Sequence, residues 1–179
     1  PAAAWDETSP YFGQEETWTN HLNMDDLFQT GVADNTNVSF ERSGKDFASR
    51  ISFSNMNMSG VNPNSGAIRR YANVKTMFTP MKDLRVSFDY KYTYKKNHNA
   101  ATEGYGAGSN NPYSDILQWG QTNVNLKQYK DYKRPDGSFR SWNITDYNDF
   151  TPAFHDSPYA QYNEINNTNT REFHVLAGD

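Results

Sequence analysis

The amino-acid sequence predicts an all-β fold, namely a fragment of a large antiparallel transmembrane β-barrel with long extracellular loops. Three observations lead to this prediction. One stretch alternates apolar and polar residues without a break, aliphatic residues are scarce while aromatic residues are common, and short connections between strands alternate with long ones. Each feature is typical of strands that meet lipid on one side and water on the other.

The strongest alternation runs from residue 84 to residue 95. Because successive side chains of a strand point to opposite faces, this stretch predicts one apolar and one polar wall. The residues expected to face lipid are Leu84, Val86, Phe88, Tyr90 and Tyr92, followed by Tyr94. The residues expected to face the aqueous lumen are Arg85, Asp89 and Lys91, joined by Arg50 from an earlier strand. The tyrosines at one end of the apolar wall suit the aromatic girdle of a membrane barrel.

The composition is unusual for a water-soluble core. The chain has 179 residues, of which 15% are aromatic, and Leu, Ile, Val and Phe together number 29, roughly 16%. The net charge is only −4, so plain disorder fits poorly. The chain has no cysteine, which excludes disulfides and thiolate metal sites. No basic stripe suggests nucleic acid, and no apolar run is long enough for a transmembrane helix.

Four further stretches show strand periodicity, and their spacing orients the predicted barrel. They cover residues 35–42, 47–57, 70–79 and 171–177, the last with Phe173, Val175 and Ala177 in phase. The connections are short at 43–46, medium at 58–69, short at 80–83 and very long at 96–169. Outer-membrane barrels have short periplasmic turns and long extracellular loops. We therefore expect an extracellular loop region at 1–34, barrel strands with short periplasmic turns at 35–95, a long extracellular loop at 96–169, and the start of the next barrel strand at 170–179.

The loop regions contain local structure signals. Asn23 followed by Asp25 and Asp26 predicts a capped helical turn over 24–28. A second helical turn is expected at 114–119, and Pro135-Asp136-Gly137 predicts a turn. We therefore expect the long loop to fold on itself.

No stretch of the sequence predicts catalysis. The motifs of serine hydrolases, zinc proteases and phosphate-binding loops are absent, so we expect no enzyme activity, no cofactor and no metal site. The better candidates for function are aromatic loop residues that can stack on sugar rings or grip peptide side chains: Tyr105, Tyr113, Trp119 and Trp142. The alternative is that these residues pack the loop against itself or against a partner.

Several short motifs, taken in order, resemble the early barrel of SusC/RagA-type TonB-dependent outer-membrane transporters. They are Asn23 to Gly31, Asn37-Val38-Ser39-Phe40, Phe47 to Phe53, Gly60-Val61-Asn62-Pro63-Asn64-Ser65 and Arg69-Arg70, then Asn111-Pro112, Trp119, Asp131-Tyr132, Asp136-Gly137 and Trp142. The resemblance covers about residues 20 to 179. It implies a bacterial outer-membrane importer of oligosaccharides or peptides, with a SusD-like surface lipoprotein as partner and with TonB acting through a plug domain outside this chain.

The family's plug domain, accessory domain and C-terminal strand do not appear in the sequence, so we expect a piece of a larger barrel. Five strands with two open edges should not be stable alone in lipid. Two alternatives remain. The first is a secreted β-sandwich that binds carbohydrate or mediates adhesion, which would fold without detergent. The second is a glycan-processing enzyme, which would need a matched pair of carboxylates in one cleft.

Overall fold

The computed structural model describes residues 2–100, 111–154, 157–164 and 167–178, and the chain divides into two compact units. The sheet unit comprises residues 31–60, 66–98 and 168–179. The loop unit comprises residues 1–30, 61–65 and 99–167. The predicted loop regions thus form one folded body, to which the connection at 61–65 also belongs.

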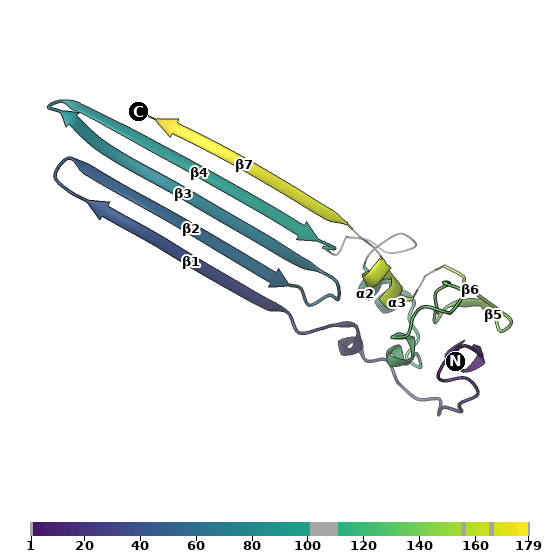
Figure 1. Ribbon diagram of the computed structural model, residues 1–179. Coiled ribbons are helices and arrows are strands. Elements are labelled where there is room, and N and C mark those ends of the chain that lie inside the picture. Colours follow the sequence, from purple (N-terminus) through teal and green to yellow (C-terminus); the bar gives the residue numbers. More distant parts are fainter. Residues whose placement is uncertain (1, 101–110, 155–156, 165–166, 179) are drawn as a thin grey trace. The chain divides into compact units, whose positions relative to one another are not determined.

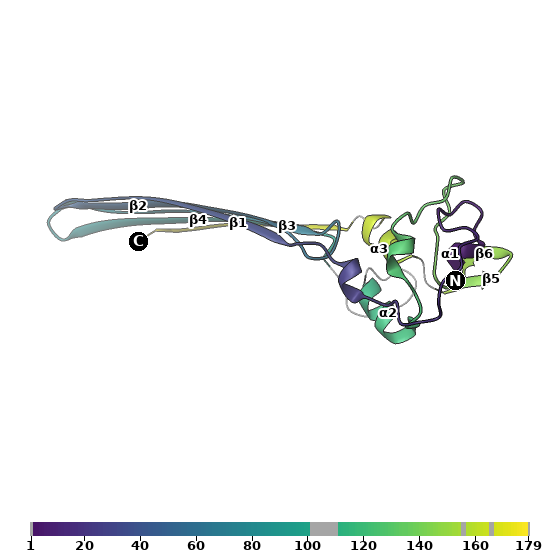
Figure 2. The same ribbon diagram turned by 90° about the horizontal axis from the view of Figure 1, so that it is seen from below.

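The sheet unit is one antiparallel sheet with the strand order β1-β2-β3-β4-β7 (Figure 1). Its strands are β1 (Val32–Ser43), β2 (Phe47–Ser59), β3 (Gly66–Met81), β4 (Leu84–His98) and β7 (Thr168–Gly178). These strands confirm the predicted antiparallel β-structure, and each extends beyond its predicted stretch. Figure 2 shows the strands edge-on as a single layer.

The two short connections of the sheet are tight hairpins, as predicted. At the first hairpin the Gly44 amide donates to the Phe47 carbonyl at 2.7 Å. At the second, Met81 pairs with Leu84, so only Lys82 and Asp83 form the turn. Asp83 has a φ of 66°, a left-handed conformation that aspartate tolerates better than most residues. One hairpin joins β1 to β2 and the other joins β3 to β4, so in this antiparallel order both hairpins lie at the same end of the sheet.

The last strand differs from the expectation of one apolar wall. Val175 pairs with Lys91 and Phe173 pairs with Thr93, so the in-phase apolar residues of β7 share a face with polar residues of β4. Contacts on the opposite face agree with this register, because the Tyr90 hydroxyl lies 2.7 Å from His174 Nδ1. Since residues alternate between faces, a shift of one residue would reverse every side chain of the strand.

The loop unit has a hydrophobic core of its own, which includes Leu27 and Leu126 at 0% exposure. Its helical elements are α1 (Ala2–Trp5), η1 (Met24–Leu27), α2 (Pro112–Trp119), η2 (Leu126–Tyr129) and α3 (Pro158–Glu164), and β5 (Ile144–Asp146) pairs with β6 (Asp149–Pro152). Asn23 caps η1 as predicted. The predicted turn over 114–119 is the end of α2, and Gly137 closes the predicted turn with a bond to Arg134.

Asparagines connect the segments of the loop unit. The Asn64 side chain donates to the Tyr162 carbonyl at 3.1 Å, and the Asn99 side chain donates to the Asn64 carbonyl at 3.0 Å. Asn99 also accepts a bond from the Asn167 amide at 2.7 Å. Asn64 and Asn99 have left-handed backbone conformations, which asparagine adopts readily. The side chains of Asn64 and Asn99 therefore hold separate segments of the loop unit together.

The register of β7 can be tested by engineered disulfides, because the chain has no native cysteine. We expect Lys91→Cys combined with Val175→Cys to form a disulfide under mild oxidation of the intact protein. Directly opposed residues have Cα atoms about 4.5–5.5 Å apart, within the range that a disulfide spans. The control pair, Lys91→Cys with Leu176→Cys, points to opposite faces and should remain reduced. Cross-linking of the control pair instead would place Val175 on the apolar face.

Candidate functional site

The sheet unit has an apolar face formed by alternate residues of its strands. Reading across the strand pairs, this face carries Val38, Phe40, Phe47, Ile51, Phe53, Ala72, Val74, Phe78, Leu84, Val86, Phe88, Tyr90 and Tyr92. All six residues of β4 predicted to face lipid, including Tyr94, share this face. The side chains remain open, since Phe40 is 62% and Phe88 is 45% exposed. The face is mainly apolar, although the row of Phe88 also contains Thr76, Ser49 and Arg42. An exposed and largely apolar surface marks a site of interaction with something apolar.

The apolar face forms a band of defined height. On β4 it runs from Leu84 to Tyr94, ten residue steps that correspond to about 33 Å of strand at about 3.3 Å per residue. Strands of membrane barrels tilt by about 40°, which reduces this length to about 25 Å along the membrane normal. Beyond the tyrosines the same face becomes polar, with Lys96 and His98 on β4. On β4 the band therefore has the height expected of a lipid-facing belt, whereas on β3 and β2 the face is already polar at Arg70 and Asn55, in the row of Tyr94.

The opposite, polar face carries charges at the level of the apolar band. Register aligns Glu41, Arg50, Lys75 and Asp89 in one row across β1 to β4. Lys91 Nζ lies 3.4 Å from Asp89 Oδ2, and this ion pair is partly exposed. Such pairs contribute only about 0–1 kcal/mol, so the charges indicate contact with water rather than a stabilising network.

The predicted lumen-facing residues Arg50, Arg85, Asp89 and Lys91 all share this polar face. Glu41 and Lys75, which stand beside Arg50 and Asp89 in the same row, were not among the predicted lumen-facing residues, although the alternation along 70–79 also places Lys75 opposite the apolar residues of its strand. Only the pairing of strands brings the four residues together.

The loop unit contains an aromatic cleft with a volume of about 230 Å³. Its lining includes Trp5, Trp18 and Trp142, together with the amide side chains of Gln121, Asn123, Asn125 and Asn143. Trp18 is 80% exposed and Trp5 is 52% exposed. Flat aromatic faces beside amides can stack on a sugar ring or an apolar side chain while bonding to hydroxyl or peptide groups.

The four aromatic residues that the sequence analysis proposed as binding candidates do not gather in one site. Trp142 lines the cleft, whereas Tyr113 and Trp119 lie at the two ends of α2 and are not part of its lining. Tyr113 packs against Phe28 with ring centroids 5.8 Å apart and ring planes tilted by 41°. Tyr105 lies outside the described residues. Trp5 and Trp18 were missed, because they are far from Trp142 in sequence and no motif connects them.

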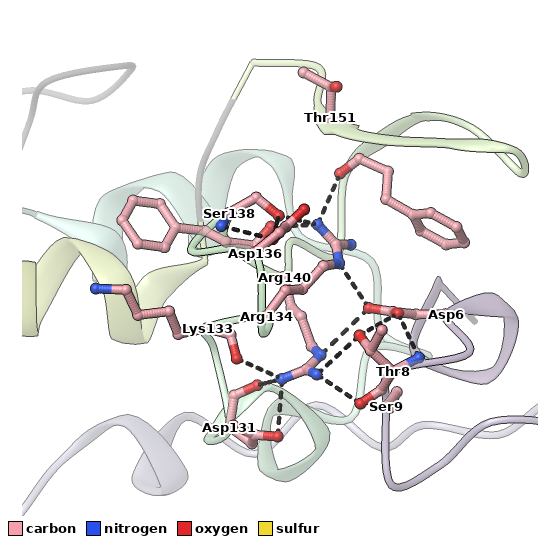
Figure 3. Close-up of polar contacts among 12 residues, drawn as sticks. Asp6, Thr8, Ser9, Asp131, Lys133, Arg134, Asp136, Ser138, Arg140 and Thr151 are labelled. Carbon is pink, nitrogen blue, oxygen red and sulfur yellow. Dashed lines mark hydrogen bonds and ion pairs between the residues drawn. The ribbon is translucent and has the colours of Figure 1, made fainter.

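An ion-pair cluster holds the segments that carry two of the cleft tryptophans (Figure 3). Asp6 Oδ2 accepts from Arg134 Nε at 2.8 Å and from Arg140 Nε at 3.3 Å. Arg140 also donates to the Thr8 carbonyl at 2.7 Å and to Asp131 Oδ2 at 2.8 Å. Asp6 directly follows Trp5, and Arg140 is two residues before Trp142. The cluster therefore fixes the two walls of the cleft relative to each other.

The charge state of Asp6 follows from its surroundings. Burial alone would raise the pKa of this carboxyl group, but hydrogen bonds from Thr8 and Arg134 and the Arg134 charge outweigh it, so the pKa lies below the ordinary 3.8. Asp6 is therefore an anion under ordinary conditions. Near the cleft, burial raises the pKa of Tyr129 to about 12, which keeps its hydroxyl neutral.

A second cleft of about 480 Å³ is lined by Asp6, Arg134, Asp136, Asp149 and Phe150, among others. Its exposed carboxylates are bonded within their own turns. Hydrogen bonds from Ser138 lower the pKa of Asp136, and hydrogen bonds from Thr151 lower that of Asp149. These carboxylates therefore stabilise turns, and no group of three potential metal ligands forms among the described residues.

Among the residues that the structure describes, no helix has the length and apolar character needed to span a membrane. Comparisons with protein-family models, curated proteins and solved structures find no match for this chain.

The role of Asp6 can be tested by substitution. We expect Asp6→Asn to destabilise the loop unit by about 3–5 kcal/mol, because it leaves the buried guanidinium group of Arg134 without an anion and removes one of the two carboxylates that pair with Arg140. Asp131→Asn is the matched control, since Asp131 also pairs with Arg140 but is 59% exposed and should contribute less than about 1 kcal/mol. Hydrogen exchange of the amides at 131–142 in the intact protein measures both effects.

The same measurement has a predicted pH dependence. Because the folded pKa of Asp6 is lowered, its stabilisation is fully present above the unfolded value of 3.8 and is lost as the pH falls through the folded value. The difference between wild type and Asp6→Asn should therefore shrink below about pH 4. Equal protection of the two proteins at neutral pH would contradict the role assigned to the cluster.

Proposed function

We propose that this chain is part of a TonB-dependent outer-membrane importer of oligosaccharides or peptides, and that its sheet is an arc of the barrel wall. The observation that carries the proposal is the apolar band, whose height matches the hydrocarbon belt of a barrel and whose reverse face is charged. A face of this kind is stabilised by lipid, and its reverse face is stabilised by water.

The open edges of the sheet support a larger barrel. The outer backbone edges of β1 and β7, strands of 12 and 11 residues, have no strand partner among the described residues. In hydrocarbon every backbone amide and carbonyl must be paired, so further strands must flank both edges. In the proposal these strands belong to the remainder of the same barrel, one large enough for its lumen to hold a plug.

The two kinds of connection support the orientation of the proposed barrel. The tight hairpins at Gly44 and Asp83 suit the periplasmic end, and the long segments that form the loop unit suit the extracellular end. The aromatic cleft of the loop unit can then capture cargo outside the cell. Exposed aromatic residues outside the cleft, such as Trp119 at 51% exposure, suit contact with a SusD-like lipoprotein.

The alternative is a secreted β-sandwich that binds carbohydrate, which the aromatic cleft would also suit. A sandwich needs a second sheet of similar size to cover the apolar face. The other described sheet pairs only β5 with β6, strands of three and four residues. This is too small to cover five strands of 11 to 16 residues, so we favour the barrel.

Membrane extraction separates the two functions. We expect the intact protein to stay with bacterial outer membranes after alkaline carbonate washing, because a barrel is held by its lipid-facing belt. We also expect Ile51→Arg to reduce the folded, membrane-integrated fraction, since a cation near the middle of the belt costs about 2–4 kcal/mol. Ser52→Arg is the matched control, because Ser52 lies on the polar face and should be tolerated.

Release of the wild-type protein by carbonate as a folded, detergent-free species would contradict the barrel and favour the sandwich. The Arg variants alone would not decide between the two functions, because Ile51 would face the core of a sandwich as well. Both measurements are therefore needed.

A further inference from the structure

The polar face of the sheet carries far more positive than negative charge. Within its five strands it presents seven cationic residues and two carboxylates, a net charge of +5, although the whole chain has a net charge of −4. The two carboxylates are Glu41 and Asp89, which lie in the row at the level of the apolar band. The excess of cations therefore lies elsewhere on this face.

Three cations form a row without anions. Arg69 pairs with Lys95, and Lys95 pairs with Arg171, so their side chains stand next to one another across β3, β4 and β7. Adjacent strands are only about 4.8 Å apart, and like charges directly opposite each other are destabilising. Among the described residues no carboxylate pairs with any of the three, and Asp89 is six residues from Lys95, about 20 Å along the strand. An arrangement that opposes folding and lacks an internal counter-ion fits a ligand that supplies the anions.

The residues beside this row have the chemistry of a sugar site. On the hairpin side, the next row on the same face is Tyr71, Thr93 and Phe173, with Tyr71 39% and Phe173 55% exposed. On the loop side, Asn97 and Asn169 are paired with each other. Two aromatic faces can stack on sugar rings, the amides can bond to hydroxyls, and guanidinium groups bind carboxylate or sulfate in bidentate fashion.

We infer that this part of the polar face, the cation row, binds an acidic oligosaccharide that carries carboxylate or sulfate groups on successive sugars. The inference rests on the proposed function, in which the polar face lines the path of the cargo, and it narrows the cargo to a negatively charged glycan. It also explains why the apolar residue Phe173 lies on a water-facing wall.

The test measures binding of three probes to the intact protein by calorimetry in detergent. Trigalacturonate represents an acidic sugar, maltotriose a neutral sugar, and triglutamate an acidic peptide. We expect trigalacturonate to bind at least about tenfold more tightly than either other probe, with affinity that falls as salt is raised. Equal binding of maltotriose would show that charge is irrelevant, and equal binding of triglutamate would show an anion site without sugar selectivity. Either result overturns the inference.

A matched pair of variants locates the site. The combined change Arg69→Gln, Lys95→Gln and Arg171→Gln should weaken trigalacturonate binding by at least about tenfold. The control Arg70→Gln with Lys96→Gln removes adjacent cations from the opposite face and should change affinity by less than about twofold. A Lys95→Arg variant keeps the positive charge and should bind trigalacturonate like the wild type. That result would show that position 95 tolerates substitution when its charge is kept. Similar effects of the triple variant and the control would overturn the inference.

The outcomes distinguish this inference from the proposed function. Loss of binding in the triple variant together with carbonate release of the protein would retain the glycan site and reject the barrel. Membrane retention together with unchanged binding in the triple variant would retain the barrel and reject the site.

Discussion

The apolar face of the sheet is the physical constraint on which the rest of this structure depends. A single layer of strands has no interior, and within the described strands only Ala67 is buried. Hydrogen bonding between strands satisfies the backbone, but it leaves two walls that need different surroundings. One wall is mainly apolar, over about 25 Å on β4, and the other carries an excess of cations, so the two walls favour different surroundings. In the proposed barrel, the boundary between lipid and an aqueous lumen would satisfy both walls.

The loop unit differs from the sheet because it has a hydrophobic core, which can hold side chains in fixed positions. Its buried leucines and tyrosines come from segments far apart in the chain, and the Asp6 cluster joins residues separated by up to 134 positions. The cluster lies next to Trp5 and close to Trp142 in sequence, so packing and electrostatics act together to shape the aromatic cleft. A cleft on a rigid body suits capture of a ligand, since less conformational freedom is lost on binding.

Local sequence patterns were sufficient to predict the strands and turns. They did not predict the register between strands or which distant residues lie side by side. The period of two along 84–95 predicted which β4 residues share a face, and the cap at Asn23 and the turn at Gly137 followed from neighbouring residues. The sequence could not show that Phe173 and Val175 join the polar face, because register depends on pairing with β4. For the same reason it could not reveal Glu41 and Lys75 beside the predicted charges, or Trp5 and Trp18 beside Trp142.

The most direct test of the account measures what surrounds each wall of β4 in the intact protein. Nitroxide labels at Phe88 and Arg85, each introduced through a single cysteine, would be compared in bilayers by their accessibility to oxygen and to a water-soluble nickel complex. The account predicts that the label at Phe88 is accessible to oxygen and shielded from nickel, and that the label at Arg85 shows the reverse. A label at Phe88 that meets nickel while Arg85 meets lipid, or labels that are shielded alike within a protein core, would contradict it.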